Sequence, residues 1–394
     1  MTKFLEKFIS IVFILIILVS FFFDLNNKTT YLWFIYEDLI YFIIFNFLII
    51  FFCIKKKINL YKLYENNKTY LILIFFFLLS YFFSKEVENI KLVIYIFPLL
   101  FIDDLKNILK YKNNFNINKL LKFIFFFNLF LIFVELFLFK YKSLYLEDIV
   151  FNSNSYNNIT KINVNSSKIQ DVIFNHEIEG IGFRAKTLIT NPISLYVNSL
   201  LLSIILSKNI NNKYYYIFIS LIVGLFAKSR LVILSLYLII NNFVFSKRLT
   251  IHQIYLSIAI VLIFIFFFNF YPIENFSYKA VFNSRLIFYF QFFEQLNLNT
   301  LLINFTNGNY LYYNHEGILT GPHSDILYFL GNYGVLITMI FFYKIFSNIK
   351  QLSILIAILA LSLFNGLLFN SFFWVFVYLL NLNFYDNNYN SHKK

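Results

Sequence analysis

The sequence predicts an all-α, polytopic integral membrane protein with about twelve transmembrane helices and two larger external loops. Of its 394 residues, 60% are hydrophobic and only 13% are charged, whereas soluble proteins carry about a quarter charged residues. Apolar runs that approach the roughly 20 residues needed to cross a bilayer recur along the chain. Short polar, lysine-rich stretches separate these runs. We therefore expect one membrane domain over residues 1–394.

The apolar runs give the expected helices in order. The first span follows Lys3 and Lys7, and no small-residue cleavage site comes after it, so we expect a retained signal anchor. The run at 90–102 is short and contains Pro98, and the run at 214–227 is also short. The expected spans are 4–23, 31–54, 69–84, 90–102, 120–139, 191–207, 214–227, 231–246, 253–270, 324–343, 352–369 and 371–383.

The distribution of basic residues predicts the orientation. With both termini in the cytoplasm, 20 of the 33 Lys and Arg residues fall in segments assigned inside and 13 outside, which obeys the positive-inside rule. The large loops at 140–190 and 271–323 and the short link 228–230 then lie outside. We expect the protein in the inner (plasma) membrane of a bacterium, with the external loops facing the periplasm.

The second large loop contains an apolar stretch of its own, from Leu286 to Phe305. Polar side chains recur on it at helical spacing, which is typical of a helix lying at the membrane interface. These polar residues are Gln291, Glu294 and Gln295.

Several functional classes are not expected. The net charge of +13 is spread over short loops and does not form one basic face, so we expect no nucleic-acid partner. The spacing of His315 and His323, and that of His176 and the acidic residues after it, match no specific metal site. No glycine-rich phosphate loop is present, and Cys53 is the single cysteine. We therefore expect neither a metal nor another cofactor.

The stretch from Gly321 to Gly334, GPHSDILYFLGNYG, places His323 where an apolar helix begins, and ionisable groups at that depth are costly. Three arginines, Arg184, Arg230 and Arg285, fall on the same predicted side. Guanidinium groups bind phosphate oxygens through paired hydrogen bonds. A histidine can accept the proton of an attacking hydroxyl. The set suits transfer of a group from a pyrophosphate-linked lipid.

Each residue also has a simpler interpretation. Lys228 and Arg230 would extend toward lipid head groups, and Arg285 would be a solvated loop charge. His323 would be a polar residue at the start of a helix that Ser324 or Asp325 caps. No single residue decides between the two interpretations.

Together, several segments resemble the O-antigen polymerase and O-antigen ligase family. SRLVILSL at 229–236 resembles the Ser-Arg helix start of that family, and Arg285 stands where its large external loop has an arginine. PHSDILYFLGNYGVL at 322–336 is similar to its His-Asn-X-X-Leu…Gly motif, although Ser324 and Asp325 stand where Asn is common. RAKTLITNPISL at 184–195 resembles a segment ahead of the middle spans. The resemblance covers about 180–345.

The resemblance implies a metal-independent, inverting glycosyltransferase. Arg230 and Arg285 would bind the pyrophosphate of a polyprenyl-pyrophosphate-linked oligosaccharide, and His323 would act as base on the acceptor hydroxyl. Arg184 would add to the anion site, and Asp325 would orient the imidazole. Membrane lipid and a chain-length regulator are the further partners that this function implies.

The leading interpretation is a polymerase that joins oligosaccharide repeat units of O-antigen or capsular polysaccharide on the outer side of the membrane. The nearest alternative is a ligase that moves finished glycan to lipid A core or to a protein. A flippase or transporter of lipid-linked sugars would instead need charged residues along an internal path and broken helices in matched halves. A purely structural membrane protein would leave the order of the motifs unexplained.

Overall fold

A computed structural model of the chain describes its membrane helices and short parts of its loops. The described residues are 2–22, 38–57, 60–111, 117–142, 146, 183, 185, 187–189, 192–209, 213–244, 302–304, 312–313, 319–320, 324–347, 349, 351–364, 367–368 and 370–382. The predicted span at 253–270 lies outside them. Of the predicted interfacial helix at 286–305, only 302–304 are described, and these three residues are not helical.

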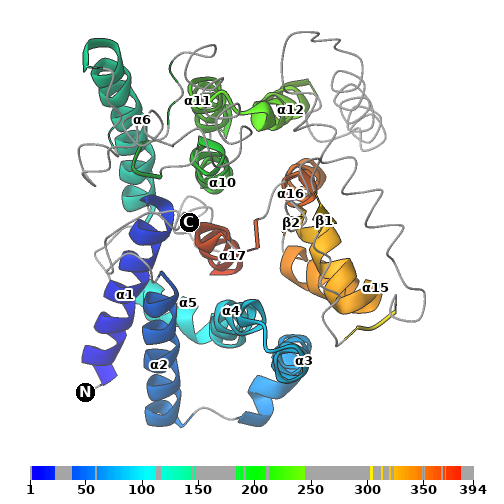
Figure 1. Ribbon diagram of the computed structural model, residues 1–394. Helices are drawn as coiled ribbons and strands as arrows, with labels where there is room; N and C mark the ends of the chain where they lie inside the picture. Colours follow the sequence, from blue (N-terminus) through cyan, green and yellow to red (C-terminus); the bar gives the residue numbers. More distant parts are fainter. Residues whose placement is uncertain are drawn as a thin grey trace. The chain divides into compact units, whose positions relative to one another are not determined.

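The chain forms two compact units, which we call the first and the second unit. The first unit comprises Met1–Phe21, Glu37–Asn116 and Ser284–Lys394, and the second Phe22–Tyr36 and Ile117–Asn283. The helices of the first unit are α1 (Thr2–Phe22), α2 (Asp38–Lys56), α3 (Leu60–Ser84), α4 (Val87–Ile96), η1 (Phe97–Phe101), α5 (Ile102–Tyr111), α15 (Asp325–Phe346), α16 (Leu352–Phe364) and α17 (Ser371–Leu382) (Figure 1). Those of the second unit are α6 (Ile117–Lys142), η2 (Thr187–Ile189), α10 (Pro192–Asn209), α11 (Lys213–Phe226), η3 (Arg230–Val232) and α12 (Ile233–Val244).

Among the described residues, five helices are long and apolar enough to cross a membrane: Phe4–Phe22, Leu39–Lys56, Asn67–Ser84, Ile117–Lys142 and Asp325–Phe346. Other predicted spans are helical but short. The 14 residues of α11, for example, extend about 21 Å, against a hydrocarbon core of about 30 Å. The fold is therefore that of a helical protein with several helices able to span a bilayer, as expected of a polytopic membrane protein.

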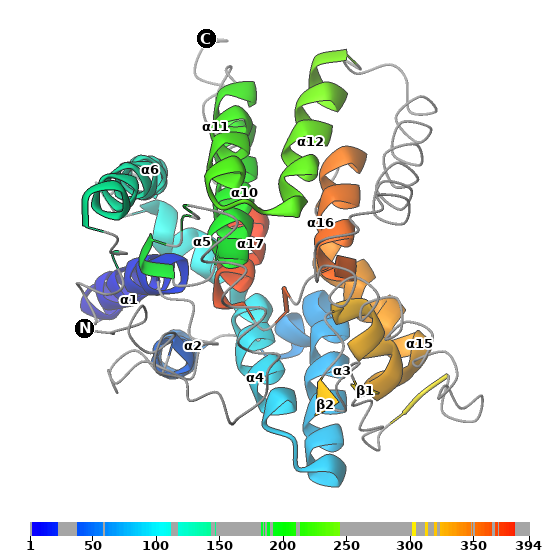
Figure 2. The same cartoon turned by 45° about the horizontal axis from the view of Figure 1, so that its top comes forward.

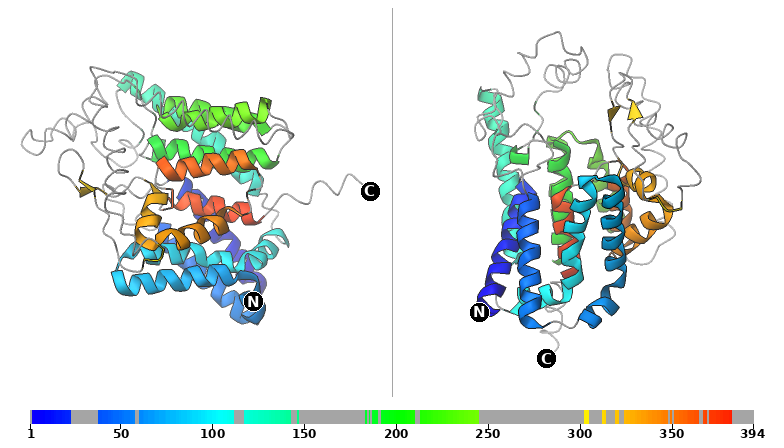
Figure 3. Two further views of the ribbon diagram at one scale, coloured as in Figure 1. Left: turned by 90° about the vertical axis from the view of Figure 1, so that its right-hand side faces the viewer. Right: turned by 60° about the horizontal axis from the view of Figure 1, so that its bottom comes forward.

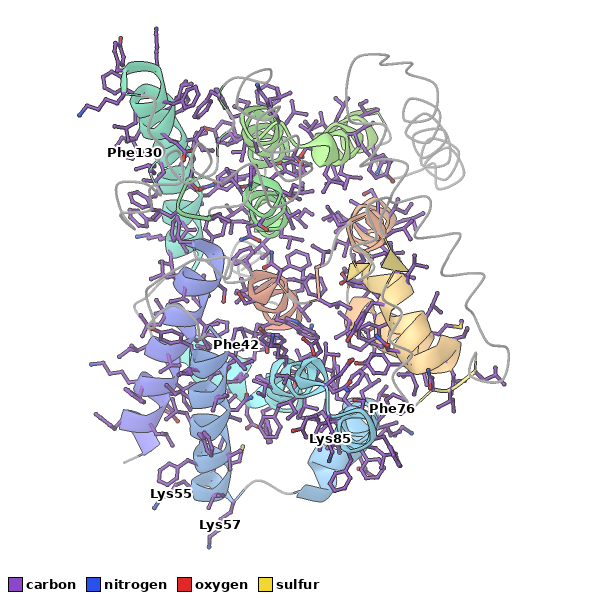
Figure 4. The ribbon with its side chains drawn as sticks, in the orientation of Figure 1. Phe42, Lys55, Lys57, Phe76, Lys85 and Phe130 are labelled. Atoms are coloured by element: carbon purple, nitrogen blue, oxygen red, sulfur yellow. The ribbon has the colours of Figure 1, made fainter. Side chains whose placement is uncertain are left out.

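Large apolar side chains are exposed along the long helices. Phe47 on α2 and Phe75 on α3 are each 68% exposed, and Phe130 on α6 is 59% exposed (Figure 4). Soluble proteins rarely expose wide apolar surfaces, so these faces suit contact with lipid tails. At the end of α2, Lys55 and Lys57 extend away from the helix (Figure 4), where charged side chains are expected to reach head groups.

The predicted short span at 90–102 is part of a longer helical stretch. The helices α4, η1 and α5 follow one another without a break from Val87 to Tyr111, and Pro98 lies in the first turn of η1. Proline has no N–H to donate and is tolerated at a first helical turn. Figure 3 shows this stretch beside α3 in the first unit.

Aromatic rings form the core of the first unit. The ring of Tyr95 on α4 stacks on that of Trp374 on α17 at 5.5 Å and meets Phe42 of α2 edge-on at 4.9 Å. The hydroxyl of Tyr378 donates to the carbonyl of Tyr95, and the indole N–H of Trp374 donates to the carbonyl of Leu368 at 2.7 Å. The polar ends of these rings therefore have partners in the apolar core.

The second unit packs α10, α11 and α12 side by side (Figure 2). Gly224 of α11 permits the close approach, because a Cβ there would lie 2.7 Å from the ring of Tyr196 and from Val232. The hydroxyl of Tyr196 is 2.8 Å from Ser235 Oγ, which is 3.0 Å from Ser220 Oγ. Small residues and hydroxyls of this kind are typical of packed membrane helices.

A short hairpin was not predicted by the all-α class. Tyr312–Tyr313 (β1) pairs antiparallel with Leu319–Thr320 (β2), with Tyr312 opposite Thr320. Along the sequence, the hairpin lies in the second large loop, between Arg285 and His323.

Candidate functional site

The start of α15 is built around two polar residues. Ser324 is the N-cap, with φ −135° and ψ 121°, and its side chain accepts a hydrogen bond from the N–H of Leu327. Asp325, the first helical residue, is only 2% exposed. The alternative in which Ser324 caps this helix is confirmed. His323 itself lies outside the described residues.

Asp325 fastens the start of α15 to the link between α16 and α17. Its Oδ2 accepts hydrogen bonds from the N–H groups of Leu367, at 2.5 Å, and Leu368, at 3.1 Å. These two donors follow the end of α16, so the carboxylate provides acceptors for backbone groups in the link. The predicted role of Asp325 in orienting the His323 imidazole stays a prediction, and the contacts of Oδ2 show an anchoring role beside it.

α15 is broken at Gly334, in the middle of the stretch that carries the His motif. Gly334 has φ 80° and ψ 172°, outside the helical region, and the helix bends there (Figure 1). A break in a membrane helix exposes backbone groups that need other partners.

The segment Leu302–Asn304 supplies those partners. The side-chain amide of Asn304 donates to Gly331 O at 3.0 Å, and its backbone N–H donates to Tyr333 O at 3.2 Å. The N–H of Leu336 donates to Leu302 O at 3.1 Å. The C-terminal part of the loop with Arg285 is thus joined to the helix that follows His323. Neither the break nor its partner segment was predicted from the sequence.

The same part of α15 is joined to the turn between α3 and α4. The hydroxyl of Tyr333 donates to Asn89 Oδ1 at 2.5 Å, and the Asn89 amide donates to Ser84 Oγ at 3.0 Å. Figure 4 labels Lys85 in this turn and Phe76, whose ring lies 5.9 Å from that of Tyr333. These contacts fix the position of α15 against α3 and α4 of the first unit.

In the second unit, a tight turn precedes Arg230. Lys228 adopts a left-handed conformation, with φ 46°, after the end of α11, and the N–H of Ser229 donates to Gly224 O at 3.0 Å. Ser229 is 4% exposed, and its Oγ has no hydrogen-bond partner in the described parts of the chain. Arg230 opens η3 directly after it. Ser80 and Ser362 have buried hydroxyls of the same kind, so what distinguishes this turn is its position directly before Arg230.

The segment after Arg184 is attached to the same turn. The N–H of Ala185, a fully buried residue, donates to the carbonyl of Phe226 at 2.9 Å. Phe226 is the last residue of α11, four residues before Arg230. The chain segments that carry two of the predicted anion-binding arginines are thus joined by a backbone hydrogen bond.

These contacts agree with the predicted alternation of loops within each unit. In the predicted topology, Asp325 and Leu367 lie at the outer ends of the spans 324–343 and 352–369. Ala185 lies in the outer loop 140–190, and Phe226 lies at the outer end of the span 214–227. Lys56 and Asp104, assigned to the inner side, form an ion pair at 3.3 Å. Each of these three contacts therefore joins residues that the predicted topology places on the same side of the membrane.

The placement of the candidate residues differs from one to the next. The side chain of Asp325 is described, the backbone of Arg230 is described, and Arg184, Arg285 and His323 lie outside the described residues. Asp325 belongs to the first unit and Arg230 to the second. In the described parts, no group of three or more His, Cys, Asp or Glu side chains is suited to hold a metal ion.

A further ionisable residue, Glu135, lies within the predicted span 120–139. This carboxylate is fully buried, and both of its oxygens accept the N–H of Thr187, at 2.9 and 3.1 Å.

Comparison with known proteins finds no relative: no protein-family model, no curated protein and no solved structure matches the chain.

Proposed function

We propose that the protein is a membrane glycosyltransferase that polymerises oligosaccharide repeat units carried on a polyprenyl pyrophosphate. The observation that carries the proposal is the order and shared predicted side of three motifs: Ser229-Arg230, Arg285 in the large loop and Pro322-His323. The tight turn at Lys228 and Ser229, directly before Arg230, and the anchored start of α15, directly after His323, support it.

In the proposed reaction, Arg230 and Arg285 bind the pyrophosphate of the donor, and Arg184 adds to this anion site. The acceptor hydroxyl oxygen attacks the anomeric carbon from the face opposite the pyrophosphate. A new C–O bond forms, the bond to the pyrophosphate oxygen breaks, and His323 takes the hydroxyl proton. Negative charge develops on the leaving polyprenyl pyrophosphate, so fixed guanidinium groups stabilise the transition state more than the ground state. The configuration at the anomeric carbon inverts.

One structural observation bears on the flippase alternative. A broken helix such as α15 is typical of transporters, where the freed backbone groups bind substrate or ions. Here the groups around Gly334 that are described bind Leu302 and Asn304 of the same chain. The break thus serves to join two segments of the first unit, which favours the enzyme.

The test is the glycan profile of cells lacking the gene, complemented with wild type or with His323→Ala, Arg230→Ala or Arg285→Ala. We expect single repeat units on the surface lipid of the deletion cells, and no polymer with any of the three variants at wild-type protein levels. Lys140→Ala is the matched control, because Lys140 is an exposed basic residue assigned to the same side. It should restore polymer fully.

The other outcomes separate the alternatives. Surface lipid that lacks glycan altogether, with full-length polymer still on its lipid carrier, identifies a ligase. Repeat units that accumulate on the cytoplasmic side identify a flippase. Polymer restored by all three variants would contradict the proposed site.

A further inference from the structure

Glu135 is a buried charge that the proposed reaction does not use. It lies well inside α6, at 0% exposure, in a helix long and apolar enough to span a membrane. A carboxylate in such a place is costly unless it is well bonded, and it often marks a functional site. Its two oxygens accept the N–H of Thr187, 52 residues further along the chain.

Thr187 needs this support because its backbone is strained. Its φ is 55°, and a β-branched residue rarely adopts the left-handed region. Its hydroxyl lies 3.5 Å from Asn128 Oδ1, and the Asn128 amide donates to Ser199 Oγ at 3.1 Å. Strained residues held by their surroundings cluster at functional sites. Here α6 holds the strained residue through two side chains, Asn128 and Glu135, which lie about two turns apart on the helix.

The strained segment is the one that carries Arg184. Two residues before Thr187, the N–H of Ala185 donates to Phe226 O at the end of α11. The segment is therefore held at two points, by α6 and by the turn that leads to Ser229 and Arg230. Two guanidinium groups brought near each other repel, so the segments that carry them need rigid anchors when no anion is bound.

We propose that Glu135 is a positioning residue that holds the Arg184 segment against the Arg230 turn, so that both arginines serve one pyrophosphate-binding site. The proposal rests on the proposed function for the identity of the anion, a prenyl pyrophosphate. Glu135 itself does not touch the substrate in this account. Its carboxylate acts through the backbone of Thr187.

The test is a double-mutant cycle on the full-length protein in lipid nanodiscs, with radiolabelled geranylgeranyl pyrophosphate as the probe. The variants are Glu135→Gln, Arg184→Ala and the two together. We expect each single variant to bind the probe about tenfold more weakly, and the double variant no more weakly than Arg184→Ala alone, because coupled residues are not additive. Lys140→Ala is the control and should bind as wild type does.

Thermal unfolding of each variant is measured in the same nanodiscs, since a merely structural role would lower stability without coupling to Arg184. Should Glu135→Gln fail to fold, Asn128→Ala replaces it, because this variant removes the acceptor of the Thr187 hydroxyl and leaves the carboxylate in place. The same coupling, with a smaller loss of about threefold, is then expected.

Additive effects, or a Glu135→Gln protein that binds as wild type does, would overturn the positioning role. Wild type that does not bind the probe would overturn the anion site. Polymer lost in the Arg230, Arg285 and His323 variants together with an additive cycle would leave the glycosyltransferase intact and remove only this inference. Coupling between Glu135 and Arg184 in the cycle, together with polymer restored by those variants, would support the positioning role and contradict the proposed glycosyltransferase site.

Discussion

Asp325 and Glu135 are buried carboxylates, one in each unit, and both accept hydrogen bonds from the backbone of a distant link between helices. They differ in what they hold. Asp325 lies at the start of α15, and one of its oxygens accepts two N–H groups from the link before α17. Both oxygens of Glu135 accept the N–H of Thr187, a strained residue, and Glu135 itself lies in the middle of a helix.

This difference separates anchoring from positioning. Asp325 accepts two buried backbone N–H groups, and its loss should mainly cost stability. Glu135 accepts the N–H of Thr187, and the segment it holds carries a predicted substrate-binding arginine. Loss of Glu135 should therefore weaken ligand binding as well as lower stability. The two units can be followed separately, because Cys53, the only cysteine, lies in α2 of the first unit.

The largest effect is expected for Asp325→Ala. It leaves the N–H groups of Leu367 and Leu368 buried without an acceptor, at about 1–3 kcal/mol each, so the first unit should lose about 2–6 kcal/mol. Thermal unfolding in detergent, followed by the reaction of Cys53 with a thiol-specific fluorophore, measures the loss. Asp325→Asn keeps an acceptor oxygen and should lose clearly less. Equal loss in the two variants would mean that the negative charge, and not the acceptor, matters.

Gly334→Ala should come next, with a loss of about 2–4 kcal/mol. The residue has φ 80°, and a Cβ there would lie 2.7 Å from the carbonyl oxygen of Leu302, a backbone atom that cannot easily move. The same Cys53 assay measures the change. We also expect the segment Leu302–Asn304 to become accessible to protease.

Gly224→Ala in the second unit is the matched comparison. Its new Cβ would meet the side chains of Tyr196 and Val232, which can shift, at an ordinary helical φ. We expect a loss of about 1–3 kcal/mol, read from a cysteine placed at the buried Ala227 in a Cys53→Ser background. A larger loss of stability here than at Gly334 would show that the backbone around Gly334 and Leu302 shifts to accommodate the new Cβ more easily than its geometry suggests.

Glu135→Gln should destabilise the second unit by about 1–3 kcal/mol, less than Asp325→Ala destabilises the first. The glutamine amide can still offer one acceptor oxygen to the N–H of Thr187, whereas Asp325→Ala leaves two N–H groups without their acceptor. The Ala227→Cys reporter measures the loss. A loss equal to that of Asp325→Ala would remove the distinction between the two carboxylates.

The sequence predicted the helices better than the contacts between them. Apolar runs are local, so the starts and ends of α6, α10 and α17 fall within a few residues of the predicted spans. The break at Gly334 was not predicted, because its cause is the segment Leu302–Asn304, about thirty residues away in the chain. Periodicity carries no information on such a partner.

The same limit applies to the candidate site. The start of α15 could be predicted, because Ser324 is a typical N-cap ahead of an apolar run. The partners of Asp325 and Glu135 lie 42 and 52 residues further along the chain, and both are backbone N–H groups, which every residue but proline offers. Nothing in the identity of Leu367 or Thr187 marks it as a partner. Only the fold brings these pairs together.

The smallest effect is expected where a charge pair is exposed. Lys56 and Asp104 form an ion pair at 3.3 Å in the first unit, but their side chains are 48% and 27% exposed. Lys56→Met keeps the aliphatic stem near the ring of Phe52 and removes only the charge. We expect a change below about 1 kcal/mol, because water and salt screen such pairs. The Cys53 assay at low and at 1 M salt should give a difference that shrinks as salt rises, whereas the Asp325 effect should persist, since its partners are buried neutral groups.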